Sequence, residues 1–308
     1  MDTPLVSIVV ITYNSSKYVL ETLESAKKQT YKNIELIITD DCSTDDTIQI
    51  CRDWLDKNSE NFVHTRLVTS PVNTGIPANA NRGYKAAQGE WIKGIAGDDI
   101  LLPDCVERLL NASKDCDILI GISQSFKGLD GKRILGEQYP SEDNYAFFDD
   151  SAMKQHKRLL VNSFNFAPGS FLNKNLFLKL GGYDEQFRYL EDLPFWLKCT
   201  SNGYKLSLLK EPVVLYRTGH DSMVFQTQKV YNIAFYECLF SFRKKNIYRQ
   251  VPWYNIMFWE KEMVERFVYH FVVHICKNRN TPLARSVMKI SSYLYFQLYY
   301  YWIKRHLS

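Results

Sequence analysis

The sequence lacks any stretch that is long and uncharged enough to span a bilayer. The first apolar run, Leu5 to Ile11, is too short, and Lys289 and Gln297 interrupt the most apolar run near the C-terminus. The first run also has no basic leader and no small-residue cleavage site, which excludes a secretory signal peptide. We therefore expect an unprocessed chain that resides in the cytoplasm.

Regular cysteine and glycine patterns are also missing. The seven cysteines, an odd number, are scattered among 308 residues without CxxC or zinc-type spacing, so neither a disulfide framework nor a cysteine metal site is indicated. There is no Gly-x-Gly-x-x-Gly turn and no Gly-Lys-Ser/Thr sequence, which excludes a dinucleotide site and a Walker-type site. A bound phosphate would therefore need a metal ion as well as backbone N–H groups.

What is present is an ordinary globular composition, with 45% hydrophobic and 23% charged residues, and an uneven distribution of charge. Residues 241–308 hold 12 Lys and Arg against 3 Asp and Glu, a net charge of +9, whereas residues 1–240 hold 26 against 31, a net charge of −5. The basic region is crowded with aromatic residues. This combination suits helices that lie in a membrane interface near anionic lipid, and the alternative is that the aromatics pack internally or form a dimer.

The N-terminal part of the chain alternates strand-like and helix-like segments. The strand-like runs are rich in β-branched residues without polar alternation, as in strands that are covered on both faces. The expected strands are Leu5–Thr12, Ile34–Thr39, Phe62–Val68, Glu90–Gly97 and Ile118–Ile122. Three helices are expected between them: Lys17–Lys28, a second helix directly after Asp41, and Ala78–Ala87. In the second helix, Ser43 or Thr44 would be the N-cap, and Asp45 and Asp46 would lie in the first turn. This order predicts an α/β fold with a mostly parallel central sheet flanked by helices.

Polar pairs follow three of these strands: Thr12-Tyr13, Asp40-Asp41 and Asp98-Asp99. Ligands of open α/β sheets lie outside the carboxyl ends of the strands, so the three pairs are expected to line one crevice. Carboxylates there are hard oxygen ligands for Mg²⁺ or Mn²⁺, and such an ion neutralises charge on a departing diphosphate. Taken alone, Gly97-Asp98-Asp99 is also typical of a simple turn, because Gly and Asp are common turn residues.

Six stretches resemble the inverting glycosyltransferases of family 2, which have the GT-A nucleotide-sugar-binding fold. They are Val6–Asn14, Asp40–Asp45, Asn79–Gly83, Gly97–Asp99, Gly181–Glu185 and Glu191–Asp192. They occur in the family's order over roughly residues 4 to 225, which makes the match more specific than any single motif. The resemblance implies a GT-A domain over residues 1–225, followed by a helical C-terminal region over residues 226–308.

The resemblance implies roles for the residues at the strand ends. Tyr13 would lie against the nucleotide base with Thr12 near it, and Asp41 would accept a hydrogen bond from the base imide, which favours uracil or thymine. Asp98 would face the ribose, and Asp99 would face the metal ion and the diphosphate. Without the resemblance, Tyr13 is equally a packed loop aromatic, and Asp41 is a residue at the start of a helix.

Inversion requires a carboxylate that deprotonates the acceptor hydroxyl on the face opposite the leaving diphosphate. The pair Glu191-Asp192 precedes an apolar, helix-like run that would hold both carboxylates beside the crevice, where a partly dry site would raise their pKa. The resemblance assigns the base to Asp192 rather than to Glu191. The alternative is that the pair only complements a helix dipole.

Other candidates flank the crevice. Arg82 could reach phosphate, orient Asp98 by a bidentate pair, or be an ordinary surface residue. Arg217 and His220 resemble a family segment whose Arg and His approach the diphosphate or the metal ion, but His220 is offset by one residue from the commoner spacing, so a structural role competes with metal ligation. The polar stretch from Lys127 to Asp150 is expected to be an acceptor-side loop.

Together these observations predict a metal-dependent, inverting glycosyltransferase. It would move a sugar from a nucleoside diphosphate, expected to be UDP, to a hydroxyl of a saccharide acceptor, with Mn²⁺ or Mg²⁺ as cofactor. A lipid-linked acceptor in polysaccharide assembly would place the protein peripherally on the inner face of the membrane. Two alternatives remain: a catalytically inactive nucleotide-sugar-binding protein, and a nucleotidyltransferase, which would need a Gly-rich, basic loop after the first strand. Nucleic acid is not an expected partner, because an acidic crevice repels phosphate.

Overall fold

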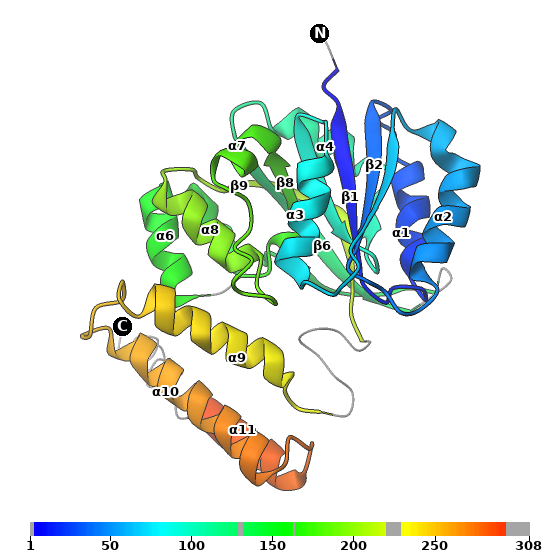
Figure 1. Cartoon of the computed structure of the whole chain (residues 1–308). Helices are drawn as coiled ribbons and strands as arrows, with labels where there is room; N and C mark the ends of the chain where they lie inside the picture. Colours follow the sequence, from blue (N-terminus) through cyan, green and yellow to red (C-terminus); the bar gives the residue numbers. More distant parts are fainter. Residues whose placement is uncertain (1–2, 129–131, 163, 220–228, 294–308) are drawn as a thin grey trace. The chain divides into compact units, whose positions relative to one another are not determined.

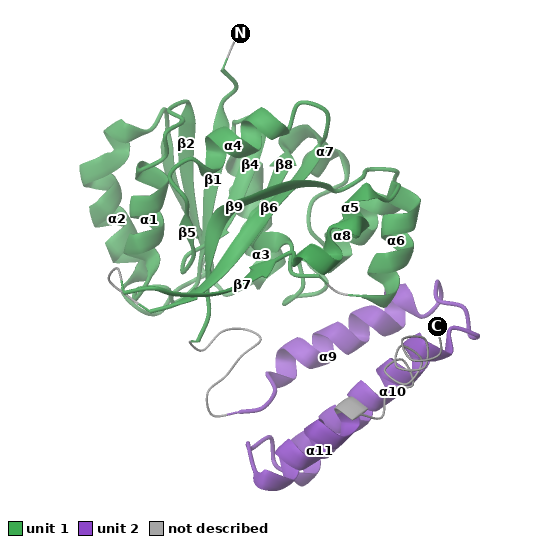
Figure 2. Ribbon diagram, turned by 180° about the vertical axis from the view of Figure 1, so that it is seen from behind, with its two compact units in different colours: residues 1–219 green, residues 220–308 purple. Residues whose placement is uncertain are grey.

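The structure is a computed structural model, and it describes residues 3–128, 132–162, 164–219 and 229–293. The chain divides into two compact units, Met1–Gly219 and His220–Ser308, which Figure 2 colours green and purple. This division lies six residues before the domain boundary expected between residues 225 and 226.

The described part of unit 1 contains a mixed nine-stranded sheet (Figure 1). Its neighbouring strands follow the order β3-β2-β1-β4-β8-β6-β9-β5, and β7 pairs with β6 outside this path. β1 is parallel to β2 and β4, and β2 is parallel to β3, whereas β5, β7 and β8 contribute antiparallel pairs. The strands are β1 Val6–Thr12, β2 Ile34–Asp40, β3 Thr65–Thr69, β4 Trp91–Ala96, β5 Ile100–Leu101, β6 Ile118–Lys127, β7 Ile134–Tyr139, β8 Ser170–Asn173 and β9 Ser207–Arg217.

Helices connect these strands, and their apolar faces pack on the sheet. In α1, Val19, Leu23 and Ala26 recur at helical spacing and all three are buried. α1 and α2 lie side by side (Figure 1), and α6 packs against α8. The α-helices of unit 1 are α1 Val19–Lys27, α2 Thr47–Asn58, α3 Ile76–Ala86, α4 Cys105–Ala112, α5 Ala146–Asp149, α6 Ala152–Val161, α7 Lys174–Lys179 and α8 Asp192–Ser201.

The central strands form a core that fixes the sheet edge. Every residue of β2 is buried, and β1 is buried at every position except Ile11. This agrees with the absence of polar alternation in both strands, which is typical of a sheet covered on both faces. Each buried aliphatic side chain contributes roughly 1.5–3 kcal/mol to stability. The carboxyl ends of β1 and β2 are therefore held rigidly.

Several expected boundaries are wrong. The second helix begins at Thr47, and neither Ser43 nor Thr44 caps it, because Asp40 accepts from Ser43 and Asn14 accepts from the Thr44 N–H, which ties both residues into a loop. Its first turn contains no acidic residue. The third strand begins at Thr65 rather than at Phe62, and the stretch 127–150, expected to be a loop, contains β7 and α5.

Unit 2 is helical over its described residues. It contains α9 Ile233–Phe242, α10 Ile256–His270 and α11 Pro282–Tyr293, with π-helical turns at Arg243–Ile247 and Phe271–Ile275. Its small core includes Val268, Val272, Cys276 and Ala284. Within the described ranges, every helix falls short of the length and apolar character that crossing a bilayer requires.

Candidate active site

The ends of β1, β2 and β4 lie side by side. Thr12 is in register with Asp40. The Asp41 N–H donates to Thr12 O at 3.1 Å, and the Gly97 N–H donates to Ile11 O at 2.9 Å. A Cβ at Gly97 would lie 2.8 Å from Thr12 Cγ2, so the absence of a side chain there lets Asp98-Asp99, the acidic tip that follows β4, approach β1. The three polar pairs therefore share one edge of the sheet.

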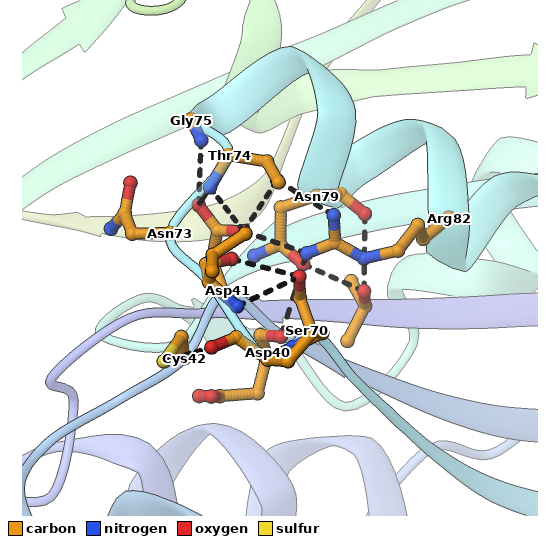
Figure 3. Close-up of polar contacts among 12 residues, drawn as sticks. Asp40, Asp41, Cys42, Ser70, Asn73, Thr74, Gly75, Asn79 and Arg82 are labelled. Atoms are coloured by element: carbon orange, nitrogen blue, oxygen red, sulfur yellow. Dashed lines mark hydrogen bonds and ion pairs between the residues drawn. The ribbon is translucent and has the colours of Figure 1, made fainter.

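Asp41 lies in a dense cluster of hydrogen-bond donors (Figure 3). Its carboxylate accepts from the Thr74 N–H at 2.9 Å, the Thr74 hydroxyl at 2.6 Å, the Gly75 N–H at 2.7 Å and Arg82 Nη2 at 2.7 Å. Burial alone would raise the pKa of Asp41, but the hydrogen bonds from Thr74, Arg82 and Gly75 outweigh burial and lower its pKa. Asp41 is therefore a permanent anion held in one orientation. Its contact with a nucleotide base stays a prediction.

Arg82 pairs with Asp41, so the expectation that it pairs with Asp98 is wrong. Its Nη1 donates to Thr74 Oγ1 at 2.7 Å, and its Nη2 also donates to Asn79 Oδ1 at 3.1 Å. The cause is the position of α3, whose residue Asn79 donates to Thr12 O at 3.0 Å and so turns this helix face toward the ends of β1 and β2. The Arg82 side chain is 24% exposed, and its Nε is buried.

Thr12 and Tyr13 differ in exposure. Thr12 is buried, and its Oγ1 donates to Asp40 Oδ2 at 2.8 Å, so it braces the loop that follows β2. Tyr13 is 48% exposed at the sheet edge. An exposed ring of this kind offers a flat face on which a base can stack. The roles of both residues near a base stay predictions.

The two carboxylates of the acidic tip also differ. Asp99 is buried, and its Oδ1 accepts from the Arg217 N–H at 2.8 Å, whereas Asp98 is half-buried. Burial and the charge of Asp98 raise the pKa of Asp99 well above its ordinary value. The hydrogen bond from the Arg217 N–H and the charge of the buried Lys93 lower the pKa, but by less. Asp99 therefore supports the tip from within the protein, and Asp98 is the more exposed residue of the pair.

Arg217 holds the acidic tip in place from β9. Its Nε donates to Asp98 O at 2.7 Å and its Nη2 to Glu21 Oε2 at 3.2 Å, while the guanidinium lies 4.5 Å from the ring centroids of both Tyr18 and Phe126. The Arg217 side chain is only 2% exposed. The expectation that Arg217 approaches a diphosphate is therefore wrong, because its donors face protein groups.

The residues at the tip fit a metal ion that is shared with a ligand. Among the described residues, no group of three His, Cys, Asp or Glu side chains could hold an ion by itself. Mg²⁺ is usually bound by one or two carboxylates together with substrate phosphates, and the half-buried Asp98 is a carboxylate of the kind that such a site uses. His220, the other expected ligand, lies outside the described residues, and the expected role of Asp99 as a metal ligand stays a prediction that its burial does not favour.

Glu191 and Asp192 form a second pair of carboxylates at the start of α8. Both side chains are half-buried, and Asp192 Oδ1 accepts from the Leu193 N–H at 2.6 Å. Loss of hydration raises the pKa of Glu191 to about 8, with a further contribution from the charge of Asp192, and raises the pKa of Asp192 to about 6. At neutral pH this pair carries about one negative charge.

The segment that precedes this pair is attached to the Asp41 cluster. Arg188 O accepts from the Ile76 N–H at 3.0 Å, and Arg188 Nη2 donates to Asn73 O at 2.7 Å. Gly75 lies between these contacts at φ +96°, where a Cβ would come within 2.2 Å of Arg188 Cγ. The two carboxylate regions are therefore joined through residues 73–76.

Two residues of the site, Thr74 and Lys93, were not predicted from the sequence, and a third, Arg217, was predicted with the wrong partner. Thr74 supplies two hydrogen bonds to Asp41, and its signal was a polar residue next to glycine between a strand and a helix. Lys93, fully buried behind the tip, donates to Gly94 O and Pro168 O, both at 2.7 Å, and its signal was a lone charge in an apolar strand. Arg217 was found, but with the wrong partner.

Comparisons with known proteins agree with this architecture. The chain is 27% identical over 283 residues to the uncharacterized glycosyltransferase MJ1057 of Methanocaldococcus jannaschii, which covers 89% of this chain and 90% of that protein. It is 28% identical over 262 residues to the putative glycosyltransferase EpsH of Bacillus subtilis, covering 80% and 71%.

Solved structures with the same fold include S. aureus TarS 1–349 in complex with UDP-GlcNAc. The TM-score is 0.58 at 19% identity, and the match covers 93% of this chain and 79% of that chain. The same protein in complex with UDP gives a TM-score of 0.55 at 22% identity, covering 87% and 72%. The expected GT-A-like fold is thereby confirmed.

The sequence profile described as "Glycosyl transferase family 2" matches residues 7–181. This span contains β1 from its second residue on, β2, β4, the Asp41 cluster and the acidic tip, and it exceeds half of the chain. The protein is therefore a glycosyltransferase, and it belongs to family 2.

Proposed function

We propose that the protein transfers a sugar from a UDP-sugar to a hydroxyl group of a saccharide, with inversion at the anomeric carbon. The observation that carries the proposal is the pairing of two kinds of carboxylate in one unit. Asp41 is a fixed anion among hydrogen-bond donors, and Glu191-Asp192 titrates near neutral pH. The first kind suits recognition and the second suits proton transfer.

The donor is proposed to bind across the ends of β1, β2 and β4. The exposed ring of Tyr13 and the oriented carboxylate of Asp41 would contact the base, and Arg82 would keep that carboxylate in place. S. aureus TarS, which has the same fold, was solved with UDP and with UDP-GlcNAc, and this supports a UDP-sugar over other nucleotide sugars.

Asp192 is proposed to be the general base. Above its pKa of about 6 it is ionised and can accept the proton of the acceptor hydroxyl as that oxygen attacks the anomeric carbon. The bond between the anomeric carbon and the diphosphate oxygen breaks, and UDP leaves with that electron pair. Glu191, whose pKa is about 8, stays protonated at neutral pH and so adds no second negative charge beside the base.

Mn²⁺ or Mg²⁺ would be held by Asp98 together with the donor diphosphate, and it would neutralise charge on the leaving group. Asp99 and Arg217 would fix the backbone of the tip from behind. Among the described residues, Asp98 would be the carboxylate ligand, and the donor diphosphate would supply further ligands.

Nucleotide binding tests the donor side of this proposal. Thermal shifts should be measured with UDP, ADP and GDP, each with and without Mn²⁺, because a ligand of the native state raises the midpoint. We expect UDP to give the largest shift and Mn²⁺ to increase it. Equal shifts with ADP or GDP, or no shift with UDP, would contradict the assignment of the base site.

Turnover separates an enzyme from an inactive binding protein. Release of UDP from a UDP-sugar should be measured with Mn²⁺ and a panel of saccharides. A catalyst releases UDP faster in the presence of an acceptor. A binding protein or a nucleotidyltransferase would bind the nucleotide without this release.

Unit 2 is proposed to rest on an anionic membrane surface, which would keep the protein in the cytoplasm at the inner face and near a lipid-linked acceptor. Trp253, Tyr254 and Phe267 are 85%, 68% and 64% exposed, and the surrounding region is strongly basic. Exposed aromatic rings insert at the depth of lipid headgroups, and basic side chains are attracted to anionic lipid. The chain should co-sediment with phosphatidylserine vesicles at low salt and not with phosphatidylcholine vesicles, and failure to bind either would refute this placement.

A further inference from the structure

Unit 1 contains a cavity of about 810 Å³ next to strand β7. It is formed by the end of β7, the turn that follows it, and residues 164–166. The side chains that matter for its chemistry are Glu137, Tyr139, Glu142, Asn144, Phe164 and Asn165. None of these residues belongs to the donor site proposed above.

The sheet places this cavity beside the acidic tip. β5, which directly follows Asp99, pairs with β9 so that Ile100 lies opposite Leu215. β9 pairs with β6, and β6 pairs with β7 so that Ser123 lies opposite Tyr139. Only two strands therefore separate the tip from the wall of the cavity.

Tyr216 on β9 is a direct link between the two places. Its ring meets the Tyr139 ring edge-on, with centroids 6.4 Å apart. Burial raises the pKa of Tyr216 to about 12, and the charges of Asp99 and Asp98 contribute to the shift. Tyr216 therefore lies close to the tip carboxylates on one side and to the cavity lining on the other.

The lining has the chemistry of a sugar site. Tyr139 and Phe164 are half-buried and line the cavity with aromatic rings, and the C–H face of a pyranose is complementary to such rings. Glu137, Glu142 and the amides accept hydrogen bonds from hydroxyl or ammonium groups. The Tyr139 hydroxyl donates to Glu137 Oε2 at 2.8 Å, which fixes the orientation of both side chains.

The charge of the lining narrows the choice of sugar. Two carboxylates line the cavity, and Lys, Arg and His are absent from its described lining. An anionic sugar would therefore meet like charges without a cationic partner, which is unfavourable. A neutral sugar meets no such cost, and an amino sugar gains an ion pair.

We propose that this cavity binds the saccharide acceptor, and that it accepts neutral or amino sugars and rejects sugars that carry a carboxylate. The inference rests on the proposed transfer of a sugar to a saccharide. It adds the location of the acceptor and the class of sugar.

Binding can be tested without turnover, so the outcome does not depend on finding the donor sugar. Saturation-transfer difference NMR would be recorded on the UDP-loaded protein with methyl glucoside, methyl glucosaminide and methyl glucuronide. We expect signals from the first two and none from the third. Tyr139→Ala should reduce both signals at least fivefold. Glu142→Lys should weaken the glucosaminide signal and allow the glucuronide to bind.

Glu60→Lys is the matched control, because Glu60 is an exposed glutamate in the turn Ser59–Asn61 and does not line the cavity. It should leave all signals unchanged. The UDP thermal shift of each variant verifies folding and the donor site separately. The proposal is overturned if no glycoside binds, if the glucuronide binds as well as the glucoside, or if Tyr139→Ala and Glu142→Lys bind like Glu60→Lys. Failure of UDP binding would instead refute the donor assignment.

Discussion

Two carboxylate sites in unit 1, the buried Asp41 and the half-buried pair Glu191-Asp192, differ in their hydrogen-bond donors and in the direction of their pKa shifts. Asp41 receives hydrogen bonds from two backbone N–H groups, one hydroxyl and one guanidinium, which lower its pKa despite burial. Asp192 interacts only with backbone N–H groups, those of Leu193 and of Asp192 itself, among the hydrogen bonds described for it, and its pKa rises to about 6. For Asp41 the hydrogen bonds outweigh the effect of burial on the pKa, whereas for Asp192 the loss of hydration outweighs the hydrogen bonds.

The comparison explains why one fold needs both regions. A recognition site works best with a charge that does not change with pH, because its ligand contact then persists. A base must gain and lose a proton during each turnover, which requires a pKa near the working pH. Glu191 strengthens the contrast, since its pKa of about 8 keeps it protonated beside Asp192.

The largest effect is expected for Asp192→Asn. It removes the proposed base but keeps the shape of the side chain, so the transfer rate should fall by roughly 10²–10⁴-fold, the usual contribution of a general base. UDP affinity should change less than twofold. Steady-state rates and calorimetric titration with UDP measure the two quantities. A variant that retains more than a tenth of the rate would place the base elsewhere.

Asp41→Asn should act on stability and donor affinity rather than on proton transfer. The variant leaves Arg82 without its anionic partner, and breaking a buried pair of this kind costs on the order of 3 kcal/mol in the free energy of unfolding. Urea denaturation measures this loss, and UDP titration should show weaker binding. Asp53→Asn is the control, since Asp53 is exposed and contacts only Gln49 among the bonds described for it. Equal stability of the two variants would contradict the structural role assigned to the Asp41 carboxylate.

The pH dependence of the transfer rate follows from the raised pKa of Asp192. A base acts when deprotonated, so activity should be fully present above its folded pKa of about 6 and be lost as the pH falls through that value. Below pH 6 the rate should decrease about tenfold per pH unit. UDP binding should stay constant over the same range, because Asp41 remains ionised. A transfer rate that is flat down to pH 4.5 would assign proton removal to a group with an ordinary carboxyl pKa.

Glu191→Gln should produce the smallest effect, and it concerns stability. The folded pKa of Glu191 is about 8 against an ordinary value of 4.5, so the stability that its protonated form contributes is lost as the pH rises from about 4.5 to 8. After allowance for solvent screening, the loss is on the order of 1 kcal/mol. Melting curves between pH 6 and 9 should fall less steeply for the variant than for the wild type. Parallel curves would show that Glu191 has an ordinary pKa.

Much of the fold could be predicted from the sequence, because its signals are local. The continuous apolar run of β1 and the helical spacing of Val19, Leu23 and Ala26 each act over a few residues. The start of α2 was misplaced because Asp40 and Asn14, distant in sequence from one another, hold the loop residues Ser43 and Thr44. Contacts of this kind between segments cannot be deduced from helix-cap preferences alone.

The candidate site shows the same limit. Motif order located Asp41, Asp98 and the pair Glu191-Asp192, but it did not separate a buried carboxylate from an accessible one in Asp98-Asp99. That distinction depends on the Arg217 N–H, which is 118 residues away from Asp99 in the sequence. Likewise, the partner of Arg82 depends on which face of α3 lies against the ends of β1 and β2.

The most direct test is a pH titration of the side-chain carboxyl groups by ¹³C NMR, with signals assigned through Asp41→Asn, Asp192→Asn and Glu191→Gln. We predict midpoints near 6 and 8 for the Glu191-Asp192 pair, and an Asp41 signal that stays in its ionised position over the same range. Titration of the pair below pH 5, or of Asp41 together with the pair, would contradict the division between a fixed anion and a titrating base.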